Sequence, residues 1–95
     1  MTYTKNRRDG NEKEIIAFFI KAGASMVQGK PGQGYDWLVL FRGQLHIVEI
    51  KMPNERYRLT VAERSFRDVS DSHGIEYNVI TSVEEAAEMI GAAIC

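Results

Sequence analysis

The chain has 95 residues, 44% of them hydrophobic and 26% charged, and a formal net charge of −1. This length predicts one domain with a single hydrophobic core, and the composition is that of an ordinary globular protein. No apolar stretch approaches the roughly 18 to 20 residues of a membrane-spanning helix, and the N-terminus lacks the hydrophobic core of a signal peptide. The single Cys95 excludes an intramolecular disulfide and a cysteine metal cluster. We therefore expect a cytoplasmic protein without a membrane partner.

Charge is distributed unevenly along the sequence. Through Arg67 there are 12 basic and 7 acidic residues, whereas from Asp68 onward there are 6 acidic residues and no basic one. This asymmetry suits a surface that faces phosphate groups and is backed by an acidic surface, although a charge-mixed solvated surface is the alternative. Residues 1–10 form a polar basic arm with Arg7 and Arg8, which we expect to be frayed or to become ordered only against a nucleic acid.

A single folded domain is expected over residues 11–95. Its first element is a helix over 11–22, because Asp9 or Asn11 can cap the start and Gly23 can end the helix in the left-handed conformation.

Two acids lie near the start of this helix, on different faces. A period of about 3.6 residues places Glu12 on the side of Ile15 and Phe19, toward the core, and Glu14 on the opposite side. Each acid also has a structural explanation. Glu12 can complement the helix dipole, and Glu14 can complete a capping box with Asn11.

A short apolar segment at 24–28 predicts the first strand, and a glycine-rich loop over 29–34 follows it. The loop lacks the Gly-Lys-Ser/Thr ending of a P-loop and leads to a strand rather than a helix. We expect its backbone to approach a phosphate group that Lys30 also contacts, with a plain flexible connection as the alternative.

Residues 35–51 predict a β-hairpin, because two runs of alternating β-branched, aromatic and aliphatic residues flank Arg42 and Gly43. With these two residues as the loop, Asp36 lies opposite Glu49. Side chains alternate between the two faces of a strand. One face of the hairpin therefore carries Asp36, Leu38, Leu40, Leu45, Ile47, Glu49 and Lys51.

The two acids of this face would have Cβ atoms roughly 4.5 to 5.5 Å apart. Carboxylates at that distance on a mostly apolar face repel and are poorly solvated, unless a cation lies between them or one of them is protonated. A divalent metal ion is the simplest expectation. The alternative is a salt bridge from Lys51 to either acid, which is common on exposed faces, but an unneeded acid pair among leucines and isoleucine would be costly.

A loop over 52–59, with Arg56 and Arg58, follows the hairpin. The next helix is expected over 60–72, and its Thr-x-x-Glu start forms a capping box that gives Glu63 a structural role. The apolar residues of this helix that we expect to face the core are Val61, Phe66 and Val69.

A strand over 76–81 and a final helix, which opens with a capping box of Ser82 and Glu85, complete the chain. The order α-β-β-β-α-β-α predicts an α/β fold with a four-stranded mixed sheet flanked by helices.

Asp36 followed by Glu49-Ile50-Lys51 resembles the D…(D/E)xK signature of the PD-(D/E)XK nuclease superfamily, in which a hairpin holds both acids and the lysine. The wider pattern, roughly from Arg8 to Gly91, is similar to the VRR-NUC branch of that superfamily. It comprises an acid-rich helix (NEKEII), a Gly-Ala-Ser segment, a Gly-x-Asp strand start, the ExK strand, an LTxAE helix and SVEEA after the closing strand.

Two positions depart from the family pattern. Tyr35 stands where a proline usually precedes the acid, and proline there only fixes the entry into the strand. Glu63 stands where a glutamine is often found at the start of the LT helix, so the fourth motif of the family is altered at this residue.

The resemblance implies a restriction-endonuclease-like fold and a site for Mg²⁺, or for Mn²⁺ as a substitute. Hard oxygen donors select these ions over zinc. The implied ligands are Asp36, Glu49, the Ile50 backbone carbonyl, and Glu12 or Glu14 from the first helix, with periodicity favouring Glu12. Lys51 would orient or deprotonate the attacking water and stabilise the phosphate oxygens.

The implied activity is metal-dependent endonucleolytic hydrolysis of phosphodiester bonds in DNA, selective for DNA structure. Small standalone VRR-NUC proteins, often phage-encoded, are similar to resolvases that act on four-way (Holliday) junctions as homodimers, and we expect the same here. The alternatives are a monomeric flap or nicking nuclease and a catalytically silent DNA-binding module with the same fold. The basic residues expected to contact DNA are Arg7, Arg8, Lys30, Arg56, Arg58 and Arg64.

Overall fold

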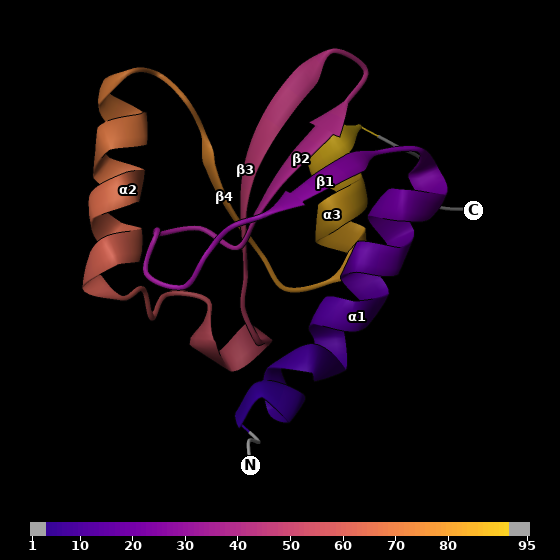
Figure 1. Ribbon diagram of the computed structural model, residues 1–95, viewed down its shortest axis with the longest axis horizontal. Helices are drawn as coiled ribbons and strands as arrows, with labels where there is room; N and C mark the ends of the chain where they lie inside the picture. Colours follow the sequence, from indigo (N-terminus) through magenta and orange to yellow (C-terminus); the bar gives the residue numbers. More distant parts are fainter. Residues whose placement is uncertain (1–3, 92–95) are drawn as a thin grey trace.

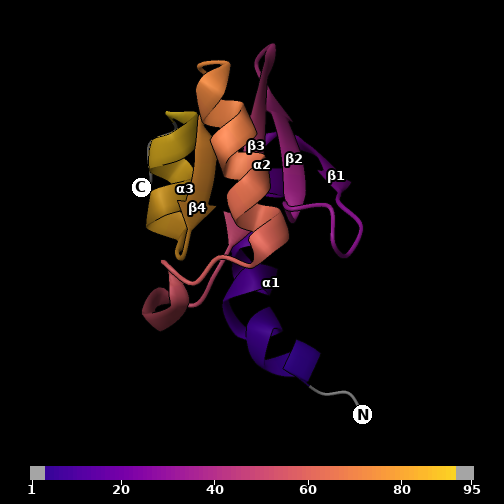
Figure 2. The same ribbon diagram turned by 90° about the vertical axis from the view of Figure 1, so that its left-hand side faces the viewer.

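The structure is a computed structural model that describes the backbone of residues 4–91 and the side chains of residues 10–91. Its elements are α1 (Thr4–Ala22), β1 (Ser25–Gln28), β2 (Trp37–Phe41), β3 (Gln44–Ile50), the 3₁₀ turn η1 (Pro53–Glu55), α2 (Val61–Ser72), β4 (Tyr77–Ile80) and α3 (Val83–Ile90). The strands form one sheet in the order β1-β2-β3-β4, in which β3 and β4 are parallel and the other neighbours antiparallel. Figures 1 and 2 show α2 on one face of the sheet and α1 and α3 on the other. The predicted α/β class and element order are confirmed.

Helix α1 begins earlier than predicted. It starts at Thr4 rather than residue 11, so the backbone of the described part of the expected arm is helical. Asn11 consequently lies inside the helix and caps nothing at its start. The end of the helix agrees with the prediction, since Gly23 follows it with φ 99°. The side chains of Arg7 and Arg8 lie outside the described residues.

The hairpin has the predicted loop and register. Arg42 and Gly43 have φ of 51° and 77°, and two consecutive residues of positive φ form the kind of turn whose twist matches that of the flanking strands. Phe41 pairs with Gln44 and Leu38 with Ile47. The alternation of faces inferred from the sequence therefore holds along the hairpin.

The hydrophobic core lies between the sheet and the helices α1 and α3. Its buried side chains are Ile15, Phe19, Val39, Val48, Ile50, Ile80 and Ala86. The opposite, acid-bearing face of the hairpin is turned toward α2. There Ile47 and Glu49 are buried, but Leu40 and Leu45 near the hairpin loop are 41% and 56% exposed. Helix α2 thus covers only the end of this face that carries the acids.

Helix α2 begins with the predicted capping box at Thr60, but its packed side differs from the prediction. Val61 and Val69 are 73% and 61% exposed. Phe66 instead anchors the helix, because its ring lies 5.2 Å from that of Tyr35 and 6.1 Å from that of Tyr77, measured between centroids. The aromatic contact fixes the rotation of the helix and turns both valines outward. Within residues 4–91, no helix is long and apolar enough to span a membrane.

Candidate active site

Glu49 is the buried centre of the site. It lies near the end of β3, its side chain is fully buried, and neither carboxyl oxygen has a hydrogen-bond partner among the residues that the structure describes. The Lys51 Nζ atom lies 3.5 Å from Glu49 Oε2. A carboxyl group in such surroundings is unfavourable unless a cation or a proton compensates for the lost hydration.

Asp36 lies beside the end of β3, although not in the ladder pair that the sequence predicts. The β2–β3 ladder ends at Trp37 and Val48, and the Asp36 backbone N–H donates to the Val48 carbonyl at 3.0 Å. The Asp36 carboxylate, through Oδ2, accepts the Ile50 N–H at 2.9 Å. The side chain thus takes the place of a backbone carbonyl. This hydrogen bond holds the Asp36 carboxylate next to the Glu49-Ile50 peptide.

Lys51 and Glu63 complete a charge cluster with Asp36 and Glu49, in which Glu49 is buried and the other three side chains are partly buried. The Lys51 Nζ atom lies 3.0 Å from Glu63 Oε1, and both side chains are 14% exposed. The same Glu63 oxygen accepts the Thr60 N–H at 2.9 Å, which forms half of the capping box. The capping role inferred from the sequence is therefore correct, and it also brings the carboxylate to the site. The first turn of α2 and the end of β3 are joined through this one side chain.

The two glutamates of the charge cluster have pKa values that are shifted in opposite directions. Burial, together with the neighbouring carboxylates of Glu63 and Asp36, raises the pKa of Glu49 to about 9, although Lys51 opposes this shift. Burial alone would raise the pKa of Glu63 too, but the Glu49 carboxyl group, the Thr60 amide and Lys51 outweigh it and lower that pKa. At neutral pH, without another cation, Glu49 holds a proton and Glu63 balances the lysine.

Of Glu12 and Glu14 on α1, Glu12 is the one turned toward the site. The Trp37 Nε1–H donates to Glu12 Oε2 at 3.0 Å. Glu12 lines a cavity of about 860 Å³ together with Asp36 and Glu63, whereas Glu14 is exposed. The helical periodicity identified the correct side, although α1 starts seven residues earlier than predicted.

The cavity lies between the glycine-rich loop and the first turn of α2, and close packing holds these two segments together. Gly34 has φ 97°, and a Cβ atom there would lie 2.7 Å from the Ala62 carbonyl oxygen. The buried Tyr77 hydroxyl donates to the Gly34 carbonyl at 2.5 Å. Burial and the carboxylates of the charge cluster raise the pKa of Tyr77, so it remains a donor. No feature of the sequence pointed to Tyr77.

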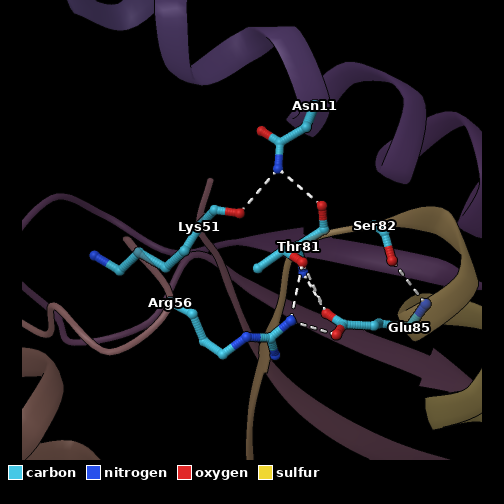
Figure 3. Close-up of polar contacts among 6 residues, drawn as sticks. All are labelled: Asn11, Lys51, Arg56, Thr81, Ser82 and Glu85. Atoms are coloured by element: carbon cyan, nitrogen blue, oxygen red, sulfur yellow. Dashed lines mark hydrogen bonds and ion pairs between the residues drawn. The ribbon is translucent and has the colours of Figure 1, made fainter. Parts of the chain in front are cut away.

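Asn11 is a second residue that the sequence reasoning missed. Its Nδ2 group donates to the Lys51 carbonyl at 2.9 Å and to the Thr81 carbonyl at 3.2 Å, as Figure 3 shows. One amide of α1 thereby joins the ends of β3 and β4. An asparagine within a helix, next to a glutamate on the inward side, was the only signal for it.

The basic residues expected to contact DNA occupy different environments. Lys30 is exposed and lines the cavity, and Arg58 and Arg64 are exposed. The Arg56 guanidinium instead donates to Thr81 Oγ1 at 3.2 Å and forms an ion pair with Glu85, also visible in Figure 3. Arg56 thus has a structural partner on α3, which the sequence did not indicate.

Oxygen donors are the only ligand type that the charge cluster offers to a cation. The Asp36 carboxylate accepts the Ile50 N–H and acts electrostatically on Glu49, and Asp36 and Glu12 line the same cavity, whose lining does not include Glu49. Across the described part of the chain, no group of three or more His, Cys, Asp or Glu side chains is arranged to hold a metal ion. Mg²⁺ commonly binds proteins through one or two carboxylates and keeps several waters, so the pair Asp36 and Glu49 suits this ion. Comparison of the chain with protein-family models, with curated proteins and with solved structures found no match.

Proposed function

We propose that this protein is a metal-dependent, structure-selective DNA endonuclease with a restriction-endonuclease-like fold, and that it resolves four-way junctions as a homodimer. The observation that carries the proposal is the Glu49 carboxyl group, which is fully buried, has no hydrogen-bond partner within the described residues, and lies 3.5 Å from a Lys51 ammonium group that is closer to Glu63. If this position had a purely structural role, an apolar side chain of similar size would stabilise the fold more than a glutamate. A function that requires the carboxylate accounts for it.

In this proposal, Asp36 and Glu49 hold Mg²⁺, or Mn²⁺ in its place, with the Ile50 carbonyl and Glu12 as further ligands. The bound ion would supply a nucleophile at neutral pH and stabilise the charge that develops on the phosphate. Glu49 has to lose its proton to become a ligand, so its raised pKa makes binding of the ion compete with protons.

The other residues of the site would orient the metal ligands and neutralise the charge of the phosphate groups. Lys51 is 14% exposed, which leaves its ammonium group within reach of a phosphate oxygen or an attacking water. Glu63 holds that ammonium group in place through its ion pair. Trp37 fixes the Glu12 carboxylate by its hydrogen bond. Lys30, at the mouth of the cavity, would contact a phosphate group of the bound strand.

The homodimer follows from the symmetry of the proposed substrate. A four-way junction presents two equivalent strands, and two copies related by a two-fold axis would place one site on each of them. Analytical ultracentrifugation at micromolar concentration should therefore give about twice the 10.8 kDa mass of the chain. A monomer would favour the flap or nicking nuclease instead.

The test is cleavage of a labelled panel (four-way junction, flap, linear duplex and single strand) in Mg²⁺, Mn²⁺ or EDTA. We expect paired, metal-dependent nicks in the junction. The substitutions Lys51→Ala and Asp36→Asn should abolish cleavage and largely retain DNA binding, because the exposed basic side chains Lys30, Arg58 and Arg64 remain. The matched control is Lys21→Ala, which removes an exposed lysine from the far end of α1.

The remaining outcomes discriminate between the alternatives. Cleavage of flaps alone would retain the active site and remove the argument for a dimer at a junction. Tight binding without cleavage of any substrate would identify a silent DNA-binding module, in which the ion pair of Lys51 and Glu63 is purely structural. Equal loss of binding and cleavage in both variants would assign Lys51 and Asp36 to the fold rather than to chemistry.

A further inference from the structure

The turn between β3 and α2 presents an aromatic ring to solvent. Tyr57 is 91% exposed, more than any other large hydrophobic side chain among the described residues. The residues on either side of it in the sequence are Arg56 and Arg58. Most of an amphipathic side chain such as tyrosine is apolar, and a ring with so little cover is available for contact with another molecule.

The outward position of Tyr57 results from a folded turn. The Glu55 N–H donates to the Met52 carbonyl at 2.8 Å, and the Arg58 N–H donates to the Glu55 carbonyl at 2.9 Å. Arg56 is directed inward, where its guanidinium contacts Thr81 and Glu85, as Figure 3 shows. Arg56 is thus held on α3, whereas the Tyr57 ring next to it in the sequence remains open to solvent.

The anchor itself is reinforced. The Glu85 carboxylate accepts the Thr81 N–H at 2.7 Å and the Thr81 hydroxyl at 3.0 Å, in addition to its ion pair with Arg56. Thr81 also offers its carbonyl to Asn11, next to Glu12 on α1. The turn is therefore tied through Thr81 to the same helix that carries a site acid.

The turn is also close to the site along the chain and in space. It begins directly after Lys51 and ends at Thr60, which lines the cavity. Figures 1 and 2 both place η1 at the end of the molecule where β3 and β4 terminate and where α1 begins. A strand of DNA whose phosphate group reaches Lys51 would thus pass near the exposed ring.

We propose that Tyr57 stacks on an unpaired or unstacked nucleobase of the bound DNA, while the exposed Arg58 contacts a neighbouring phosphate group. This inference rests on the proposed function for the identity of the substrate, and it adds how the substrate is selected. Aromatic rings bind splayed-out bases by stacking, whereas the faces of bases inside a continuous duplex are covered by their neighbours. The ring therefore selects branch points, flaps and bulges over linear duplex, without reading their sequence.

The test measures binding in EDTA, so that its result does not depend on cleavage. The probes are a four-way junction and a bulged duplex, each with 2-aminopurine at the branch point or bulge, and a linear duplex of the same sequence. We expect the protein to change 2-aminopurine fluorescence on the first two probes. Tyr57→Ala should bind those two about 10-fold more weakly and abolish the fluorescence change, with unaltered affinity for linear duplex.

Three further variants separate stacking from other effects. Tyr57→Phe keeps the ring and should behave as the unsubstituted protein. Arg58→Ala should weaken binding to all three probes and lower the salt dependence by about one counterion. Leu45→Ala removes another exposed apolar side chain, 56% exposed against 91% for Tyr57, from the hairpin far from the turn, and should change nothing.

If Tyr57→Ala binds each probe as tightly as the unsubstituted protein does, the inference is overturned and a protein partner for this ring is favoured. Loss of binding to linear duplex as well would also overturn it, since the ring would then act without selecting structure. Cleavage together with Tyr57-independent binding would leave the proposed function intact and remove only this inference. Tyr57-dependent binding without cleavage would keep this inference and remove the proposed nuclease activity.

Discussion

The two faces of the sheet differ in chemistry. The face toward α1 and α3 is closed by apolar side chains such as Phe19, Val39 and Val48, all fully buried. The face toward α2 encloses Glu49 and its charged neighbours at one end and leaves Leu45 exposed at the other. Packing on the first face supplies the stability, and the second can therefore carry a carboxyl group that is unfavourable for folding. Such a division is expected where a site is built for a ligand rather than for the fold.

The largest effect should come from the apolar face. Phe19→Ala removes a fully buried ring from the core and should lower the free energy of unfolding by about 3–5 kcal/mol, measured by urea denaturation. Leu45→Ala, on the exposed end of the other face, should change it by less than about 0.5 kcal/mol. Similar losses in both variants would show that the two faces do not divide as described.

The charged face should show an effect of similar size that depends on pH. The pKa of Glu49 is about 9 in the folded protein, against an ordinary value of 4.5. Between these values the folded state binds a proton that the unfolded chain has lost, so the stabilisation present at low pH declines as pH rises toward 9. In EDTA, the free energy of unfolding should fall by about 5 kcal/mol more between pH 5 and 9 in the unsubstituted protein than in Glu49→Gln. Parallel curves for the two proteins would contradict the raised pKa of the buried Glu49.

Loss of the Asn11 side chain, which joins α1 to the ends of β3 and β4, should have an intermediate effect on stability. Asn11→Ala removes the amide that joins the ends of β3 and β4 to α1 and should lower the free energy of unfolding by about 1–2 kcal/mol. Hydrogen exchange of the Lys51 and Thr81 amides should accelerate in this variant. Unchanged exchange there, with stability retained, would mean that the two strand ends are fixed by the sheet alone.

Local sequence determined what could be predicted of the fold. The loop at Arg42 and Gly43 and the alternation around it specify the hairpin, its register and the face shared by its acids. The capping box at Thr60 likewise specifies the start of α2. These features depend on residues a few positions apart, where turn geometry and strand periodicity decide the structure.

What could not be predicted depends on contacts between segments far apart in the chain. Asn11 meets Thr81 across 70 positions, and Arg56 meets Glu85 across 29, so neither contact has a local signature. The charge cluster was foreseen only in part, because the second role of Glu63 requires that α2 packs over the end of β3. Val61 and Val69 were misassigned since the rings around Phe66, rather than apolar periodicity, set the rotation of that helix.

The smallest effect should be spectroscopic. Trp37 is the single tryptophan of the chain and donates its indole N–H to Glu12, so its fluorescence reports on that carboxylate. If Glu12 is a ligand, Mg²⁺ should shift the Trp37 emission of the unsubstituted protein and of Glu14→Ala, but not that of Glu12→Ala. A shift that persists in Glu12→Ala would exclude Glu12 from the metal site and leave the ion to the hairpin acids.

The most direct test of the central proposal, that the buried Glu49 binds a metal ion, is calorimetric titration with Mg²⁺ at pH 7 in two buffers of different ionisation enthalpy. We predict binding with release of about one proton per ion, because Glu49 is protonated before the ion binds. Glu49→Gln should show neither binding nor proton release. Absence of binding to the unsubstituted protein, or equal binding by Glu49→Gln, would contradict the account.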